Sequence, residues 1–191
     1  MSIRIDRIVT RGGDAGQTSL GDGTRVDKSC ARIEALGAVD EANATIGVLR
    51  LHVPAMSPDA ACLARIQSLL FDIGGILCVP ESGPEGVDNF RGGDAAVAFL
   101  EQATERLRDR QAPLRSFVLP AGTPGAAHAH LARTVARRAE RQVVTLCRAE
   151  PVSASVLRCL NRLSDYLFVL ARHLNNDGQD DVLWHPGGQE S

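Results

Sequence analysis

The segment LARTVARRAERQVVTLC, residues 131–147, constrains the fold more than any other stretch of the chain, because its spacing predicts a two-faced helix. At about 100° per residue, one stripe carries the apolar side chains Leu131, Val135, Ala139, Val143 and Leu146. The opposite side carries Arg133, Arg137, Glu140 and Arg141. The apolar stripe must pack on other helices, so the arginines must face water, a ligand or a neighbouring subunit.

The arginine stripe indicates an anionic partner. Arginines four residues apart on one helix face repel one another by a few tenths of a kcal/mol per pair, and Glu140 can offset only part of this repulsion. The planar guanidinium binds phosphate or carboxylate oxygens in a bidentate manner, so the stripe suits a polyphosphate or a carboxylate of another surface. A solvated helix face explains the same spacing, and the pattern alone does not separate the two interpretations.

Composition limits the class of protein. A chain of 191 residues, 44% hydrophobic and 23% charged, can bury one substantial core, and with only 4% aromatic residues that core must be mostly aliphatic. The net charge of −2 provides no basic field for nucleic acid or for an anionic membrane. The apolar runs look far shorter than the roughly 20 residues that span a bilayer, and the N-terminus resembles no signal peptide, so we expect a cytoplasmic protein.

Neither a disulfide framework nor a zinc or di-iron site is expected. The five cysteines are an odd number with no C-x-x-C spacing, and we interpret them as small buried side chains. No glutamate has a histidine three residues later, which argues against the di-iron sites that some helical bundles hold. His128 and His130, placed ahead of the predicted helix, are interpreted as incidental. The direct ligands of any metal stay unknown at this stage.

Residues 1–28 contain RGGDAGQTSLGDGTRVDK and show no hydrophobic periodicity, which predicts a loop. Glycines let backbone N–H groups approach an anion closely, and Thr18, Ser19 and Lys28 add donors suited to phosphate. The segment lacks the G-K-[ST] element of a Walker A loop. A mobile terminal tail is the alternative interpretation.

Apolar spacing elsewhere predicts an all-α protein. Helices are expected over 29–51, with Asp27 or Ser29 at the cap, over 59–79, and from a cap at Asp94 to about Gln111, followed by 131–147 and 155–175. In the last helix Asn161, Asp165, Phe168 and Arg172 fall opposite the core stripe. We therefore expect one domain over 1–191, consisting of a nucleotide-binding N-terminal loop over 1–28, a five-helix, left-handed up-and-down bundle of ferritin-like type over 29–175, and a tail over 176–191 that Leu183 and Trp184 attach.

Three single residues allow a functional and a structural interpretation. Asp40 shares a helix face with Gly37 and Gly47, where close packing would require a cation beside the carboxylate, whereas a helix-edge position would leave it solvated. Phe117, in the connector SFVLPAGTPGAA, either fills the core or lines a ligand cavity. Asn161 offers a donor and an acceptor for a base or ribose edge, or is solvated.

Five blocks together resemble one family. In chain order they are TRGGDAGQTSLGDGTRVDK, RIEALGAVDEAN, FVLPAGT, ARTVARRAER and LNRLSDYLFVLARHLN, and they extend from about Thr10 to Trp184. Nearly the whole chain is thus similar to the PduO-type ATP:cob(I)alamin adenosyltransferases.

The resemblance implies a homotrimer with active sites between subunits, ATP and cob(I)alamin as substrates, and Mg²⁺. The residues implied for the ATP-binding loop are Thr10, Arg11, Gly12, Gly13, Thr18, Ser19 and Lys28. Those implied for the rest of the nucleotide site are Arg137, Arg138, Glu140 and Arg141, with Asn161 on the nucleoside side. Asp40 and Arg133 would form an ion pair between subunits, and Phe117 would close the lower face of the corrin. Arg11 departs from the lysine that many relatives have there.

The implied reaction moves the 5′-deoxyadenosyl group from ATP to Co(I), which gives adenosylcobalamin and triphosphate. Because Co(I) is itself the nucleophile, no activated side chain is needed. Two rival functions stay open: a module that binds and delivers the cofactor without making it, and a structural bundle without ligand. A cobalamin reductase and an adenosylcobalamin-dependent acceptor enzyme are candidate partners; nucleic acid and membranes are not.

Overall fold

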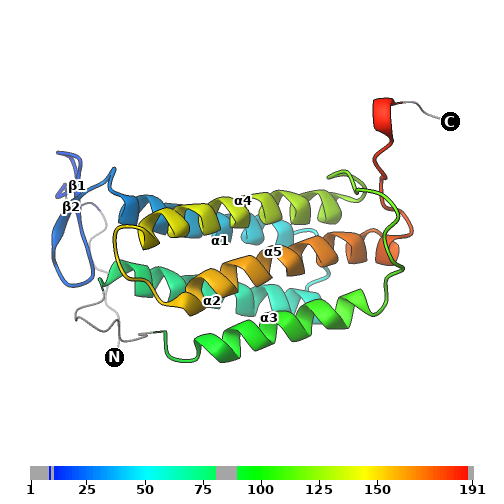
Figure 1. Ribbon diagram of the computed structural model, residues 1–191, viewed down its shortest axis with the longest axis horizontal. Coiled ribbons are helices and arrows are strands. Elements are labelled where there is room, and N and C mark those ends of the chain that lie inside the picture. The colour runs from blue at the N-terminus through cyan, green and yellow to red at the C-terminus, as the bar shows by residue number, and fades with distance from the viewer. Residues whose placement is uncertain (1–8, 10, 81–89, 189–191) are drawn as a thin grey trace.

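The computed structural model describes residues 9, 11–80 and 90–188, and its main feature is a bundle of five helices. These are α1 (Ala31–Arg50), α2 (Pro58–Cys78), α3 (Gly93–Arg108), α4 (Pro124–Cys147) and α5 (Ala154–Leu174). Consecutive helices run in opposite directions along the long axis (Figure 1). α4 packs mainly against α1 and α5, α3 packs against α5, and α1 packs against α2. The all-α bundle is confirmed, while its left-handed sense stays a prediction.

Helix α4 begins seven residues before the predicted start. Thr123 is its N-cap, where the side chain accepts a hydrogen bond from the Ala126 backbone N–H at 3.2 Å, and Pro124 occupies the first helical position. The sequence TPG therefore marks a helix start that the apolar spacing alone does not reveal. His128 and His130 consequently lie inside α4 and not ahead of it.

Two other predicted helix caps are wrong. Helix α1 starts after Cys30, which makes no side-chain cap, so neither Asp27 nor Ser29 is the N-cap. Helix α3 starts after Gly92, whose φ of 85° is left-handed, and Asp94 lies in the first turn instead. In both cases the turn geometry ahead of the helix decides its first residue, and the helix-forming pattern does not report that geometry.

The N-terminal segment is not only a loop. Residues 17–19 form β1 (Gln17–Ser19) and residues 25–27 form β2 (Arg25–Asp27), an antiparallel pair in which Thr18 lies opposite Val26. The hairpin lies beyond the end of the bundle where α1 begins and α4 ends (Figure 1). Gly23, with φ of 88°, provides the left-handed residue that the turn requires. Such short strands contain too few residues to show the period of two.

The core is mostly aliphatic, as the composition predicts, and it also buries the aromatic side chains of Tyr166 and Phe90. On α4 the buried hydrophobic residues are Ala126, Ala129, Ala132, Val135, Ala136, Ala139, Val143 and Leu146. Leu131, assigned to this stripe from the sequence, is 51% exposed. Each four-residue step advances about 40° beyond a full turn, so a stripe extended by such steps drifts off the core at one end. The cysteines are free thiols, of which Cys62 and Cys159 are buried.

Helix α2 is long and apolar enough to cross a membrane by length and composition, so the expectation that no segment reaches this length is wrong on that criterion. Only 33% of its most apolar stretch is buried inside the chain. Its buried residues, among them Leu63, Ile66 and Ile73, face the core. The outward-facing residues of α2 are mixed: Phe71 is 74% exposed, and Arg65, Ser68 and Asp72 are exposed beside it.

The C-terminal tail attaches to the connector between α3 and α4. Leu183 pairs with Val118 in an isolated β-bridge, and the backbone N–H of Trp184 donates to the Phe117 carbonyl at 2.8 Å. Arg172, predicted to face outward, is buried and donates to Asp181 at 2.7 Å. The tail thus buries this arginine. Helix periodicity does not predict this burial, because it takes no account of segments outside the helix.

Candidate functional site

The N-terminal hairpin fixes the shape of the glycine-rich turn that precedes it. Lys28 donates from Nζ to the Gly13 carbonyl at 2.9 Å, and Arg25 donates from Nη2 to the Gly12 carbonyl at 2.7 Å. A Cβ on Gly13 would lie 2.9 Å from the Lys28 amine, so a larger residue there would force the Lys28 side chain to move. Arg11 has a left-handed φ of 60°. Thr10 lies outside the described residues.

Arg25 is a basic residue that the sequence argument did not single out. It also donates to the Ser19 hydroxyl at 3.3 Å across the hairpin. Thr18 and Ser19 lie on β1, with Thr18 half-buried and Ser19 exposed. Such a short strand shows too little alternation for the sequence to predict that Arg25 and Ser19 face one another. The hairpin therefore presents two cations and a hydroxyl around one turn.

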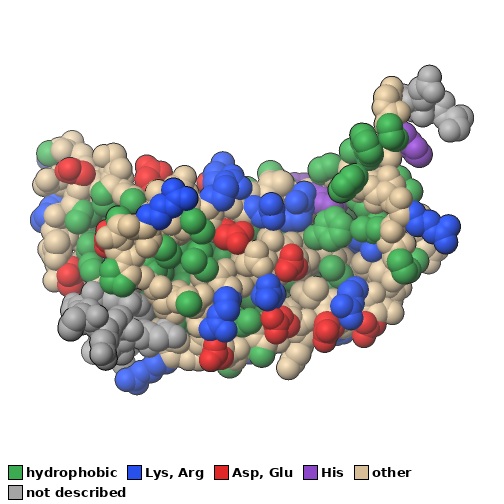
Figure 2. All heavy atoms as spheres, in the orientation of Figure 1, with side chains coloured by type: hydrophobic (Ala, Val, Ile, Leu, Met, Phe, Trp, Pro, Cys, Tyr) green, Lys and Arg blue, Asp and Glu red, His purple; other side chains and the backbone are tan. Residues whose placement is uncertain are grey.

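The arginine face of α4 is exposed as predicted. Figure 2 shows basic side chains gathered over α4. Arg137 and Arg141 point outward and form no ion pair with any described residue, although Arg141 donates to the Arg137 carbonyl at 3.1 Å. Arg138 instead forms an ion pair with Glu41 of α1. Two guanidinium groups thus remain available on this surface.

Arg133 differs from its neighbours because it is partly buried. It lines a hollow of about 360 Å³ between α4 and α5, together with Arg137, Ser164, Asp165, Phe168 and Val169. Its Nε is buried without a hydrogen-bond partner among the described residues. Burial, and then the nearby Arg137 charge, lower the pKa of Arg133. A cation held here without a partner favours an incoming carboxylate or phosphate.

Glu140 and Asn161 join α4 to α5 beside the arginine face. The Asn161 amide donates to Glu140 Oε1 at 3.0 Å, and its oxygen accepts from Arg162 Nη1 at 2.8 Å. The sequence left Asn161 as either a nucleoside contact or a solvated side chain. The amide is in fact oriented by two neighbours, which fixes the edge that it can offer to a ligand.

A second, apolar groove of about 510 Å³ runs between α1 and α2. The lining residues are Ile33, Leu36, Gly37, Val39, Asp40, Asn43, Leu70, Phe71, Gly74, Gly75 and Cys78. Asp40 is exposed here and forms no ion pair with a described residue, and the Asn43 side-chain oxygen is buried without a partner in the same part of the chain. Within one chain Asp40 and Arg133 lie in different depressions and do not meet.

Phe117 is not a core residue. Its ring is 77% exposed and meets the Trp184 ring edge-on, with the centroids 6.0 Å apart. Of the two interpretations left by the sequence, core packing is excluded. The connector that carries Phe117 lies at the opposite end of the bundle from the hairpin (Figure 1). A single chain therefore separates the two parts of the predicted site.

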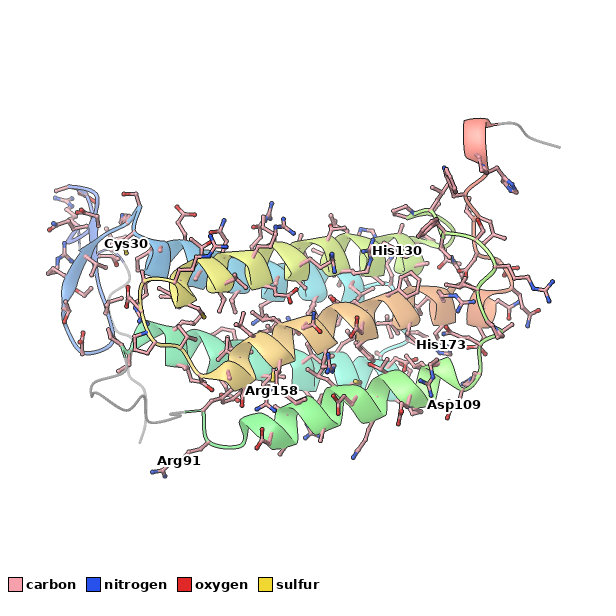
Figure 3. All side chains as sticks on the ribbon, in the orientation of Figure 1. Cys30, Arg91, Asp109, His130, Arg158 and His173 are labelled. Carbon is pink, nitrogen blue, oxygen red and sulfur yellow. The ribbon has the colours of Figure 1, made fainter. Side chains whose placement is uncertain are left out.

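The histidines and acidic residues give no sign of a resident metal. No group of three His, Cys, Asp or Glu side chains with metal-binding geometry occurs among residues 9, 11–80 and 90–188. His128 stacks on His52 at 4.4 Å between ring centroids, and His130 is buried against Phe168. Figure 3 shows His130 on α4, at the end of the bundle opposite the hairpin. Burial, and then the Arg133 charge, lower the pKa of His130, which favours the neutral ring.

Comparisons with known proteins agree with this geometry. A family model described as cobalamin adenosyltransferase matches residues 8–174. A cobalamin adenosyltransferase of Cupriavidus metallidurans is 46% identical, with 96% of this chain and 97% of the relative covered. A corrinoid adenosyltransferase of Mycobacterium tuberculosis is 43% identical, with 100% and 99% covered.

Solved structures show the same architecture. A variant PduO-type ATP:corrinoid adenosyltransferase from Lactobacillus reuteri, complexed with cobalamin and ATP, superposes with a TM-score of 0.86 at 35% identity, covering 94% of this chain and 99% of that one. A second variant from that organism, complexed with ATP, gives a TM-score of 0.84 at 36% identity, covering 93% and 100%.

Proposed function

Because the chain belongs to the cobalamin adenosyltransferase family, we infer that it is an enzyme that transfers the 5′-deoxyadenosyl group of ATP to cob(I)alamin. Co(I) supplies both electrons of the new Co–C5′ bond and becomes Co(III). The C5′–O bond breaks, and its electron pair leaves on the triphosphate. The products are adenosylcobalamin and triphosphate. The cobalt supplies the nucleophile, so the protein has to align the two substrates, stabilise the leaving group and exclude water.

The exposed guanidinium groups of Arg137 and Arg141 are the observation that carries this proposal. Negative charge develops on the triphosphate as the C5′–O bond breaks, and cations fixed in advance stabilise it without reorganisation. Both side chains are on one rigid helix and have no acidic partner among the described residues. Arg138 is held by Glu41 beside them, and we propose that it adds to the positive field of the same site.

We propose that the hairpin and the turn before it cover the triphosphate. Gly12 and Gly13 would offer backbone N–H groups, while Thr18, Ser19, Arg11 and Lys28 add side-chain donors. Lys28 and Arg25 already hold the turn through its carbonyls, so the loop has a defined shape before a ligand arrives. Thr10 is included on the basis of the sequence. Asn161 and Glu140 would contact the nucleoside, because their mutual hydrogen bond fixes both at the edge of the arginine face.

Phe117 is proposed to cover the lower face of the corrin. Its exposed ring can lie against a flat macrocycle and exclude both water and the intramolecular base from the cobalt. A cobalt without a lower ligand is easier to reduce to Co(I). The aromatic side chain thus contributes by exclusion and not by a chemical step.

The proposed assembly is a homotrimer in which the α1–α2 groove of one subunit covers the α4–α5 face of the next. The groove is apolar, and Phe71 of α2, which lines it, is 74% exposed in the single chain. Charge complementarity supports the same pairing, because Asp40 would meet the partly buried Arg133 across the interface. This contact would bring the hairpin of one subunit towards the arginine face of another.

We expect a charge exchange to test this contact. Asp40→Arg or Arg133→Asp alone should weaken the trimer and lower turnover at least about tenfold, because each leaves like charges facing one another. The double variant should recover much of both properties. Size-exclusion chromatography with light scattering and initial rates give the two measurements. Asp94→Asn, which removes an exposed pair with Arg158 on another surface, is the control. Failure of the double variant to recover either property would contradict the pairing.

Magnesium is proposed to arrive on the triphosphate. The described residues provide no cage of three acidic or imidazole ligands, which fits an ion that is bound mainly by phosphate oxygens and water. Glu140 is the carboxylate on the arginine face that could hold such an ion, and Mg²⁺ would neutralise part of the triphosphate charge. A cytoplasmic location, a reductase that makes Co(I) and an acceptor enzyme for the product are further proposals that rest on this chemistry.

Ligand binding and turnover separate the enzyme from its rivals. MgATP at about 100 times its Kd should stabilise the folded protein by about 2.7 kcal/mol, which raises Tm by several degrees. No increase in Tm would favour a structural bundle. Formation of the Co–C bond is measured by absorbance. If the protein binds ATP and corrinoid but forms no Co–C bond, only a delivery function remains. The expected result is a higher Tm together with adenosylcobalamin formation.

A further inference from the structure

The connector that carries Phe117 is held mainly by the C-terminal tail. The backbone N–H of Trp184 donates to the Phe117 carbonyl, and the backbone N–H of Leu119 donates to the Val182 carbonyl, both at 2.8 Å. The Ser116 hydroxyl donates to the Trp184 carbonyl, also at 2.8 Å. These bonds form a short antiparallel ladder that rises from the end of the bundle (Figure 1). The backbone at Phe117 is thus fixed by a segment more than sixty residues later in the chain.

Trp184 also contacts the Phe117 side chain itself. The two rings meet edge-on, with an interplanar angle of 69° and 6.0 Å between centroids. Because the Phe117 ring is so exposed, core packing does not fix its rotamer. An edge-on aromatic neighbour favours the ring orientation that keeps the two rings in contact. The orientation that Phe117 presents to a ligand therefore depends on Trp184.

A buried ion pair anchors the tail to α5. Arg172 Nε donates to Asp181 Oδ2 at 2.7 Å, and the two side chains are only 9% and 2% exposed. The same guanidinium donates from Nη2 to the Ala112 carbonyl at 3.2 Å, at the start of the connector. Gly178, with φ of 89°, lets the tail turn back so closely that a Cβ there would lie 2.5 Å from Arg172. One arginine thus holds the tail and the connector together.

Asn175 fixes the other end of the connector. Its side chain is fully buried; the oxygen accepts from the Thr123 N–H at 3.0 Å, and the amide donates to the Ala121 carbonyl at 3.2 Å and to Asp181 Oδ1 at 3.4 Å. A Cβ on Gly122 would lie 2.3 Å from this side chain, so the contact requires glycine. The connector is therefore clamped on both sides of Phe117 by groups at the end of α5.

We propose that residues 176–184 are a positioning element for Phe117, in which Trp184 sets the orientation of the ring and the Arg172–Asp181 pair anchors the segment. This inference rests on the proposed function, because it takes Phe117 as the group below the corrin. A ring that must exclude a tethered base has to be held at a fixed height, and an unsupported exposed side chain cannot do this. Trp184 acts through Phe117 and is a positioning residue.

Trp184→Ala tests the proposal. With cobalamin, kcat should fall about tenfold, because loss of orientation at a reacting centre costs rate without loss of binding. With a corrinoid that lacks the lower base, kcat should change less than about twofold, and KM for ATP should stay constant. Electron paramagnetic resonance of Co(II) cobalamin bound with ATP should show nitrogen coupling from the retained base. Trp184→Phe should restore the rate ratio, and His185→Ala, one residue further along the exposed tail, is the matched control.

Asp181→Asn provides a second variant that leaves both rings intact. It should reproduce the cobalamin-selective loss in weaker form, while the increase in Tm with MgATP persists and shows that the bundle and nucleotide site are folded. Equal slowing with both corrinoids in Trp184→Ala, or no slowing, would overturn the proposal. If Phe117→Ala slows the reaction with cobalamin selectively and Trp184→Ala does not, the positioning role of Trp184 is refuted and the role of Phe117 stands. If neither variant slows cobalamin selectively, the role proposed for Phe117 is refuted as well.

Discussion

Replacing Arg137 with alanine is expected to lower kcat by about 10²–10³-fold while the protein stays folded, because the change removes a fixed cation from the departing triphosphate. Arg137 is exposed on α4, and its side chain forms no ion pair or hydrogen bond with the described part of the chain, so no such interaction is lost with it. Arg141→Ala should have an effect of similar direction. Initial rates of Co–C bond formation at saturating ATP and corrinoid measure the change.

The charge and the geometry of Arg137 can be separated. Arg137→Lys keeps the charge but loses the bidentate fork, and it should recover part of the rate. Arg158→Ala is a matched control, since Arg158 is an exposed arginine on α5 that forms an ion pair with Asp94. This control should keep a normal rate. A kcat near the wild-type value in Arg137→Ala would refute the role in leaving-group stabilisation.

The second large effect is expected for Phe117→Ala with cobalamin as substrate, for which kcat should fall about 10²-fold. Without the ring, water and the tethered base regain access to the lower face of the cobalt and oppose reduction to Co(I). A corrinoid without a lower base has only water to compete, so its rate should fall much less. The ratio of the two rates, measured under one reducing condition, reports this difference.

Leu114→Ala is the control for Phe117→Ala. Leu114 is a partly exposed apolar residue of the same connector and has no assigned contact with substrate. It should leave the ratio between the two corrinoids unchanged. Equal slowing of both corrinoids by Phe117→Ala would mean that the ring serves the architecture of the connector and not the cobalt.

Much of the helical fold was predictable because long amphipathic helices repeat their pattern many times. The apolar series of α5, including Val156, Leu160 and Leu163, is buried as its spacing predicts. Short elements were not predicted, because they do not repeat a pattern. Strands of three residues and the first turn of α4 contain too few residues for a period to emerge, and local turn chemistry determines them.

Some residues of the candidate site were also predictable from the sequence, and others were not. Exposure of Arg137 and Arg141 followed from the helix pattern, because a core stripe on one side places charges on the other. Arg25 and Trp184 were missed as site residues, since each acts through a partner distant in sequence, the Gly12 carbonyl in one case and Phe117 in the other. No local signal marks such a pair.

The sequence by itself determined the class of the fold, the outward arginine face and the family resemblance, because these depend on periodic spacing and residue identity along the chain. Only the tertiary structure decided that Asp40 and Arg133 lie in separate depressions, that Phe117 is exposed, and that the tail buries Arg172. The physical reason is that each of these properties is set by neighbours brought together by folding, and a spacing rule includes only neighbours on the same helix.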